Sequence, residues 1–332
     1  MNAPPIRHPS GVLARPEAEL RRASNGHEPW VFRAVGPNEL LGVHAELIGR
    51  ALEPGETPGY LLYAPMWEGQ RGPFGIRVRP ASHAVVVSDR RFLVSSDPHL
   101  DGERPTVHSI PFSALLRVES GSAGTLAWLV IVWAGQGSVR SVTVLYRAIG
   151  RHHVAAATRR WRGAARPSSG GSDAGGLAWP AVWHRLDELH RGEVEPLVVE
   201  GERPLAAVSW PAVLERPHRR HGDATVRAVP AGAVIVSNLG VITVGDDFTA
   251  APGGVGLAVN AIAIPADALR RAAFADATTS GPWVTALRFE LERDGVATAF
   301  VVRFPGERLD QLEAALRMGD ELPALREVGW SS

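Results

Sequence analysis

The chain of 332 residues contains no cysteine and no lysine, and each absence excludes a class of chemistry. Without cysteine there is no thiol nucleophile, no disulfide, no cysteine-ligated zinc and no iron–sulfur cluster. Without lysine there is no Schiff base, no phosphate-loop lysine and no kinase lysine. All 35 basic residues are therefore arginine, which is typical of a high-GC bacterial genome.

Long apolar segments and an excess of one charge are missing as well. The longest apolar run, from Thr125 to Ala134, is about half the length that a membrane-spanning helix needs. The first residues lack the apolar core of a signal peptide. The 35 basic residues are balanced by 35 acidic ones, so no overall positive field indicates nucleic-acid binding. We expect a cytoplasmic, bacterial protein, with a peripheral position on the cytoplasmic face of the inner membrane as a variant.

The remaining composition is that of a globular protein, with 45% hydrophobic and 21% charged residues. Residues of the first half recur in the same order in the second half, and the offset between them only grows along the chain. Insertions in the loops of a second copy would produce this pattern, so we predict a duplication. The matched pairs include Leu40 with Leu186, His44 with His190, Gly55 with Gly201, Glu56 with Glu202, Ser88 with Ser237, Pro111 with Pro265 and Arg159 with Arg317.

Composition and periodicity place the boundaries of the two copies and their elements. Each copy is expected to open with a helix, which starts near Asn38 in the first, to continue with antiparallel strands and hairpins, and to end with a second helix. In the first copy the expected strands are 59–64, 84–87, 92–95, 107–111, 126–133 and 139–146. The expected segments are an extended tail at 1–37, a domain at 38–163, a Gly/Ser/Pro linker at 164–178, a second domain at 179–322 and a C-terminal tail at 323–332.

This order of elements predicts a mostly β fold with helices, in the α+β class. Each half would form a small β-barrel whose open end is covered by the C-terminal helix. The segment Val85-Val-Val-Ser-Asp-Arg-Arg-Phe-Leu-Val94, followed by Ile110-Pro111 and Leu126-Ala-Trp-Leu-Val-Ile131, resembles the strand signature of bacterial pleckstrin-homology-like (PH-like) domains. The resemblance implies two tandem PH-like domains that act as binding modules. Another duplicated small barrel is the alternative.

Charge is distributed unevenly between the copies. Residues 38–166 hold 15 arginines and 10 acidic residues, whereas residues 179–332 hold 15 arginines and 21 acidic residues. No acidic residue occurs from Ser120 to Ser172. This stretch could face an anionic lipid or an acidic protein, or it could pair with acidic residues of the second copy, such as Asp310 and Glu313. The basic face comprises Arg140, Arg147, Arg151, Arg159, Arg160, Arg162 and Arg166.

Ten tryptophans are many for a chain of this length. Five of them lie in the expected tails or beside prolines, where exposed aromatic rings would serve as anchors of a protein interface. The alternative for these rings is local packing. These candidates are Trp30, Trp67, Trp179, Trp210 and Trp330.

Motifs for catalysis are weak. The loop from Asp97 to Glu103 has acidic and histidine side chains at alternating positions, but it lacks the final glutamate of a calcium loop. His218 and His221 with Asp223 lack further metal ligands, and there is no serine-hydrolase elbow. We therefore predict no catalytic residue, no metal and no cofactor.

The leading hypothesis is a non-enzymatic scaffold that docks, as a peripheral cytoplasmic subunit, on a larger complex of other protein subunits. A membrane-embedded photosynthetic or respiratory complex is an example of such a host. The first alternative is a stand-alone module that binds anionic lipid or another ligand. The second is an uncharacterised hydrolase or metal enzyme, most simply one that uses His99 and Asp101.

Overall fold

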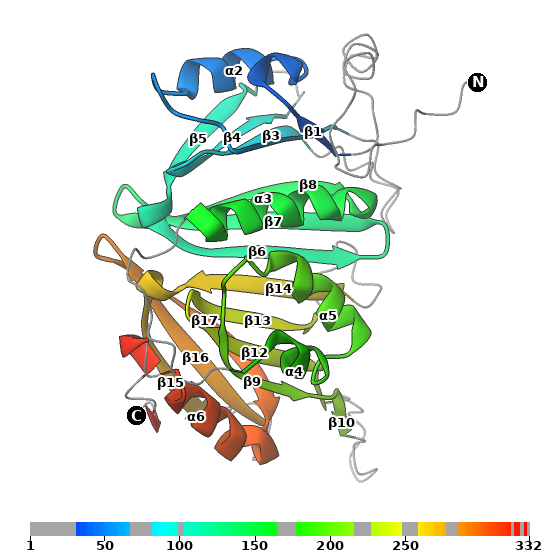
Figure 1. Cartoon of the computed structure of the whole chain (residues 1–332), viewed down its shortest axis with the longest axis vertical. Helices are drawn as coiled ribbons and strands as arrows, with labels where there is room; N and C mark the ends of the chain where they lie inside the picture. The colour runs from blue at the N-terminus through cyan, green and yellow to red at the C-terminus, as the bar shows by residue number, and fades with distance from the viewer. Residues whose placement is uncertain are drawn as a thin grey trace, which may run out of the picture.

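The same succession of elements runs through both halves of the chain in the computed structural model (Figure 1). The structure describes residues 31–66, 81–98, 103–164, 177–215, 227–247, 258–276, 284–319, 322–325 and 329–330. In the first half an opening helix and four strands are followed by three further strands and a closing helix. These elements are α2 (His44–Ala51), β2 (Tyr60–Ala64), β3 (Ser82–Val87), β4 (Arg91–Asp97), β5 (Thr106–Pro111), β6 (Leu115–Ala123), β7 (Leu126–Gly135), β8 (Ser138–Arg147) and α3 (Arg151–Ala164), preceded by β1 (Phe32–Ala34) and the 3₁₀ turn η1 (Pro37–Glu39).

The second half repeats this order, with two short helices at its start. The short 3₁₀ turns that join the two strand groups, Phe112–Ala114 and Ala266–Ala268, also lie at matching places. The elements of the second half are α4 (Trp179–Trp183), α5 (Glu188–Val194), η4 (Glu195–Leu197), β9 (Pro204–Trp210), β10 (Val213–Glu215), β11 (Arg227–Val229), β12 (Gly232–Ser237), β13 (Gly240–Asp247), β14 (Ala258–Pro265), β15 (Leu269–Asp276), β16 (Val284–Arg293), β17 (Val296–Pro305), α6 (Leu309–Arg317), η7 (Pro323–Leu325) and β18 (Gly329–Trp330).

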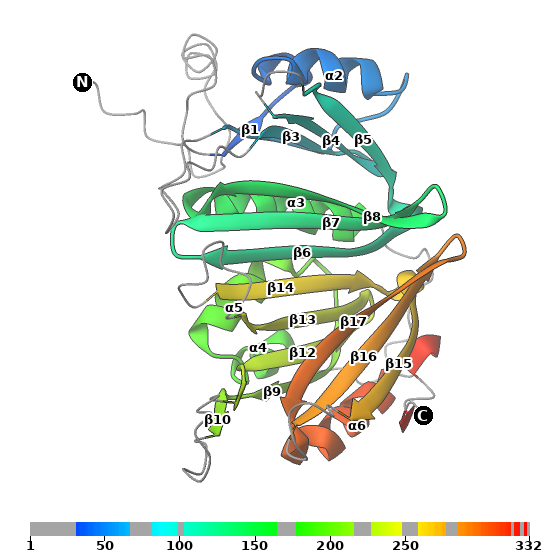
Figure 2. The ribbon, with the colours of Figure 1, turned by 180° about the vertical axis from the view of Figure 1, so that it is seen from behind.

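One sheet is continuous across both halves. Its strand order is β8-β7-β6-β14-β13-β12-β9, and the halves meet where β6 and β14 pair antiparallel. The register runs from Val118 opposite Ala263 to Ser122 opposite Val259. Figure 2 shows β6 and β14 side by side in the middle of the molecule. A five-stranded sheet, β1-β2-β3-β4-β5, shares a core with β6, β7 and β8, and a four-stranded sheet, β17-β16-β15-β18, packs against β14, β13, β12 and β9.

The strand content confirms a mostly β, α+β fold, but the prediction of closed barrels is wrong because the sheets are open. Closure within a half would need its first and last strands to pair. Instead β2 pairs with β1 on its outer side, and β6 extends the sheet into the second half through β14. The outer backbone groups of β2 and β6 are therefore hydrogen-bonded to the neighbouring strands β1 and β14.

One closing helix packs into the core of each half. Trp161 and Val154 of α3 are fully buried against Phe92 and the strands of the first half, so α3 closes the space between the two groups of strands. Leu312 and Leu316 of α6 have the same role in the second half. Burial of such large apolar side chains is the main stabilising contribution to each half.

The segments expected to be tails contain ordered elements. Within the predicted N-terminal tail, β1 pairs with β2, and Phe32 is fully buried. Within the predicted C-terminal tail, β18 pairs with β15, and Leu325 is buried. The opening helix also starts later than predicted, because Gly42 has a φ of 58°, which ends the first turn before α2 begins. Within the described ranges, no helix has the length and apolarity that crossing a bilayer requires.

Candidate interaction surface

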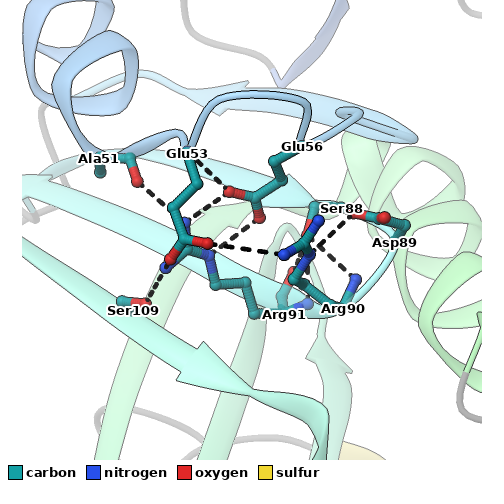
Figure 3. A network of polar contacts seen from close by, with 8 residues as sticks. All are labelled: Ala51, Glu53, Glu56, Ser88, Asp89, Arg90, Arg91 and Ser109. Atoms are coloured by element: carbon teal, nitrogen blue, oxygen red, sulfur yellow. Dashed lines mark hydrogen bonds and ion pairs between the residues drawn. The ribbon is translucent and has the colours of Figure 1, made fainter.

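A buried glutamate follows the opening helix of each half. In the first half, Glu56 is fully buried and accepts hydrogen bonds from Arg91 of the β3–β4 hairpin, at 2.9 Å from Nε and 2.5 Å from Nη2 (Figure 3). Ser109 and the Ala51 carbonyl accept from the same guanidinium. The hydrogen bonds from Arg91 lower the pKa of Glu56 to about 2, although burial opposes this shift.

Glu202 is the matching glutamate of the second half. Its carboxylate accepts from the hydroxyl of Ser237 at 2.7 Å and from the Val199 amide at 3.2 Å. The cation beside it is Arg162 of α3, which belongs to the first half. Arg162 donates from Nη2 and Nη1 at 2.5 and 2.9 Å, and the side chains of Arg162 and Glu202 are 5% and 0% exposed.

The hairpin of the second half cannot provide its own cation. The position that matches Arg91 is Gly240, which has a φ of 135°. A Cβ atom at Gly240 would lie 2.0 Å from the Ile264 carbonyl oxygen, so no arginine fits there. The second half therefore neutralises its buried carboxylate with an arginine from the first half.

The rest of α3 lies along the second half. Arg159 donates from Nε to the Pro196 carbonyl at 2.8 Å, and Arg151 lies 3.5 Å from the carboxylate of Glu193. Glu193 also accepts from the hydroxyl of Ser122 at 3.0 Å. Burial raises the pKa of Glu193, while Ser122 and Arg151 act against this shift.

A cavity of about 270 Å³ lies between the halves at this place. Its walls come from β6, β8 and α3 of the first half and from α5 and η4 of the second. The Tyr146 side chain lines it, and burial raises the pKa of that phenol. The basic segment that the sequence singled out thus borders the second half, but it faces Glu193 and Glu202 rather than the predicted Asp310 and Glu313.

The predicted basic residues differ in their exposure to solvent. Arg162 is buried, and so it is not part of an exposed basic face as we predicted, because its charge is used by Glu202. Arg147 is half-buried at the end of β8, and Arg166 lies outside the described residues. The exposed members are Arg140, Arg151, Arg159 and Arg160.

The structure describes the side chains of two of the five predicted tryptophan anchors. Trp210 is buried, with Nε1 donating to the Pro230 carbonyl at 3.0 Å, so the prediction that it is exposed is wrong. Trp179 is half-buried, stacks on Trp183 at 4.8 Å between ring centroids, and donates to the Glu202 carbonyl at 2.8 Å. The main chain of Trp330 belongs to β18, and its side chain is outside what the structure describes. Trp30 and Trp67 also lie outside the described residues.

The histidines of the opening helices occupy matching positions with different partners. His44 is buried between the hydroxyls of Ser95 and Ser82, at 2.7 and 2.9 Å. His190 lies 2.8 Å from Asp187 and 3.1 Å from Asp246. The two aspartates contact opposite nitrogens of the His190 ring, and among the described residues no group of three histidine or acidic side chains is arranged to hold a metal ion. The metal and hydrolase candidates His99, Asp101, His218, His221 and Asp223 lie outside the described residues.

Sequence reasoning noticed the repeated Glu56 and Glu202 but assigned them no role. The signal was available, since each follows a glycine and precedes a proline by two positions in both copies. A second feature that it missed is a cavity of about 470 Å³ in the second half, lined by Trp210, Ile262, Phe300 and Val302.

Comparison with protein-family models, with curated proteins and with solved structures gave no match. The fold and the contacts between the halves define a two-unit, mostly β protein whose halves are joined by a shared sheet and a buried ion pair.

Proposed function

We propose that this protein is a non-enzymatic scaffold that docks, as a peripheral cytoplasmic subunit, on a larger assembly of other proteins. Its two units would be PH-like binding modules, in line with the strand–turn–strand sequence of the first hairpin. A membrane-embedded photosynthetic or respiratory complex is one kind of host.

The two sides of α3 are the observation that carries this proposal. Its buried side holds Trp161 and Arg162, which fasten the helix to the first core and to Glu202. Its outer side leaves Arg159 and Arg160 exposed, in a stretch of chain without acidic residues. The helix thus stiffens the molecule and keeps positive charge on its surface, as docking to an acidic protein face requires.

Fractionation of the native organism tests the scaffold directly. We expect the protein to co-migrate with a large assembly, and the variant Arg159→Gln/Arg160→Gln to shift toward the free form. The matched control Arg270→Gln/Arg288→Gln removes two exposed arginines from the second half and should leave the distribution unchanged. Recovery of the wild-type protein as a lone monomer in the soluble fraction would overturn the proposal.

The same exposed arginines support a second candidate, a module that binds anionic lipid. Each basic group near an anionic membrane surface contributes about 1 kcal/mol. Vesicles that contain phosphatidylserine should then bind the wild-type protein in a salt-sensitive way, and Arg159→Gln/Arg160→Gln should weaken this binding. Arg162 is left intact in this test because its loss would disturb the Glu202 pair. Equal sedimentation with neutral and anionic vesicles would reject this candidate.

A further inference from the structure

The strand β5 and its counterpart β14 have different surroundings. In the second half, β14 lies inside the seven-stranded sheet, between β13 and β6. In the first half, β5 is the last strand of its sheet, and within the described ranges only β4 pairs with it. The Val107 side chain is accordingly 39% exposed, whereas Ala261, its match in β14, is 1% exposed.

The backbone groups on the outer side of β5 can be assigned from the antiparallel pattern. The Phe112 amide donates to the Arg90 carbonyl at 3.0 Å, on the β4 side. Because alternate residues of a strand hydrogen-bond to opposite neighbours, the amides and carbonyls of Val107 and Ser109 point away from β4. These outward groups form an unpaired edge among the described residues.

The second half shows what such an edge binds. The Ala266 amide donates to the Leu239 carbonyl, so the same alternation turns Ala261 and Ala263 outward. These two residues lie opposite Ser120 and Val118 of β6. The edge of one unit is thus covered by a strand of another unit of the same kind.

A second copy of this chain has no free strand of the β6 type within its described residues. The counterpart of β6 is β15, and the matching part of its edge is occupied by β18, with Ala273 opposite Gly329 and Phe274 opposite Trp330. A second copy therefore cannot use its β15 to pair with β5 in the way that β6 pairs with β14. Its sheets have other outer strands, among them β1, β8, β9 and β17, but β5 is the one that meets an identical strand, and two identical antiparallel strands pair about a two-fold axis.

We propose that two copies of this chain associate through their β5 strands, across a two-fold axis at His108. In this register Val107 lies opposite Ser109 of the second copy, and the two residues exchange backbone hydrogen bonds. Pro105 lies opposite Pro111, so the residues that lack an amide hydrogen coincide at the ends of the paired segment. No charged side chain occurs from Thr106 to Pro111, so the charges that usually protect an edge strand are missing. This pairing goes beyond the scaffold function and does not depend on it.

A cysteine cross-link tests the register. The chain has no cysteine, so His108→Cys introduces the only thiol. The Cβ atoms of directly opposed residues in an antiparallel pair are about 4.5–5.5 Å apart, which leaves a short movement to the span of a disulfide. We expect mild oxidation to give a covalent dimer on non-reducing gels. The control Thr143→Cys, on the exposed part of β8, should give none.

A proline substitution tests the hydrogen bonds. Val107→Pro removes an amide that points outward and leaves the bonds to β4 in place, so the fold should persist by circular dichroism. Sedimentation velocity over a concentration series should show a monomer–dimer equilibrium for the wild-type protein and for Val107→Thr, and monomer for Val107→Pro.

Three results would overturn the pairing. They are a wild-type protein that stays monomeric at every concentration, a His108→Cys cross-link no stronger than that of Thr143→Cys, and dimerisation that survives Val107→Pro. A monomeric wild-type protein would leave the β5 edge to a strand from a different protein.

Discussion

Arg162 and Glu202 form a buried ion pair across the two halves of the molecule, with nitrogen–oxygen distances of 2.5 and 2.9 Å. In the first half the equivalent carboxylate, Glu56, is neutralised within its own unit by Arg91. In the second half glycine replaces that arginine, and the first half supplies the charge. The two units are therefore alike in their elements but not interchangeable.

Removing one member of this pair should strongly destabilise the protein. Glu202→Gln leaves Arg162 buried without a counter-charge, and the expected loss in the free energy of unfolding is about 3–5 kcal/mol. The double variant Arg162→Met/Glu202→Gln should recover part of this loss, because no buried charge is left unpaired. Guanidinium unfolding measures both values, with the exposed Arg160→Gln as a control. A loss below about 1 kcal/mol for Glu202→Gln would contradict a structural role for the pair.

Gly240 should tolerate no side chain. Its φ of 135° is accessible to glycine alone, and an added Cβ would collide with the Ile264 carbonyl. We expect Gly240→Ala to lower the free energy of unfolding by about 3 kcal/mol or more. Gly295→Ala is the matched control, since Gly295 has a φ of 74° but open space around it, and should lose about 1–2 kcal/mol. Equal losses in thermal or chemical unfolding would refute the steric explanation.

Acid should destabilise the first half in two stages. Burial, and then the nearby charge of His44, lower the pKa of His83 from 6.5 to about 4. The unfolded chain therefore binds a proton first, and stability falls as the pH drops from 6.5 toward 4. The pKa of Glu56 is lowered from 4.5 to about 2, so the stability it contributes above pH 4.5 is lost as the pH falls toward 2.

Variants separate these two stages. Within its window each group changes the free energy of unfolding by up to about 1.4 kcal/mol per pH unit. The free energy of unfolding of the wild-type protein minus that of His83→Gln, plotted against pH, should show the upper stage alone. The same difference for Glu56→Gln should show the lower stage alone. Difference curves that are flat between pH 4 and 6.5 for His83→Gln would contradict its burial as a neutral ring.

Local patterns in the sequence predicted most strands and both closing helices. The segments around Val85 and Phe92 alternate or run apolar on either side of a polar turn, and they form the β3–β4 hairpin. β6 was not predicted, because Glu119, Ser120 and Ser122 break its apolar pattern. Gly121 also weakens the signal, although the glycine is required there, since a Cβ would lie 2.4 Å from the Trp128 ring.

The class of fold, the repeated order of elements and the exclusion of thiol and lysine chemistry could all be predicted from the amino-acid sequence, because they depend on composition and on short-range periodicity. The tertiary structure alone decided that β6 pairs with β14, that β18 covers β15, and that Arg162 serves Glu202 rather than the surface. These contacts join residues far apart in the chain. Their energy comes from hydrogen bonds and charges that must be satisfied once buried, and no local pattern records which partner satisfies them.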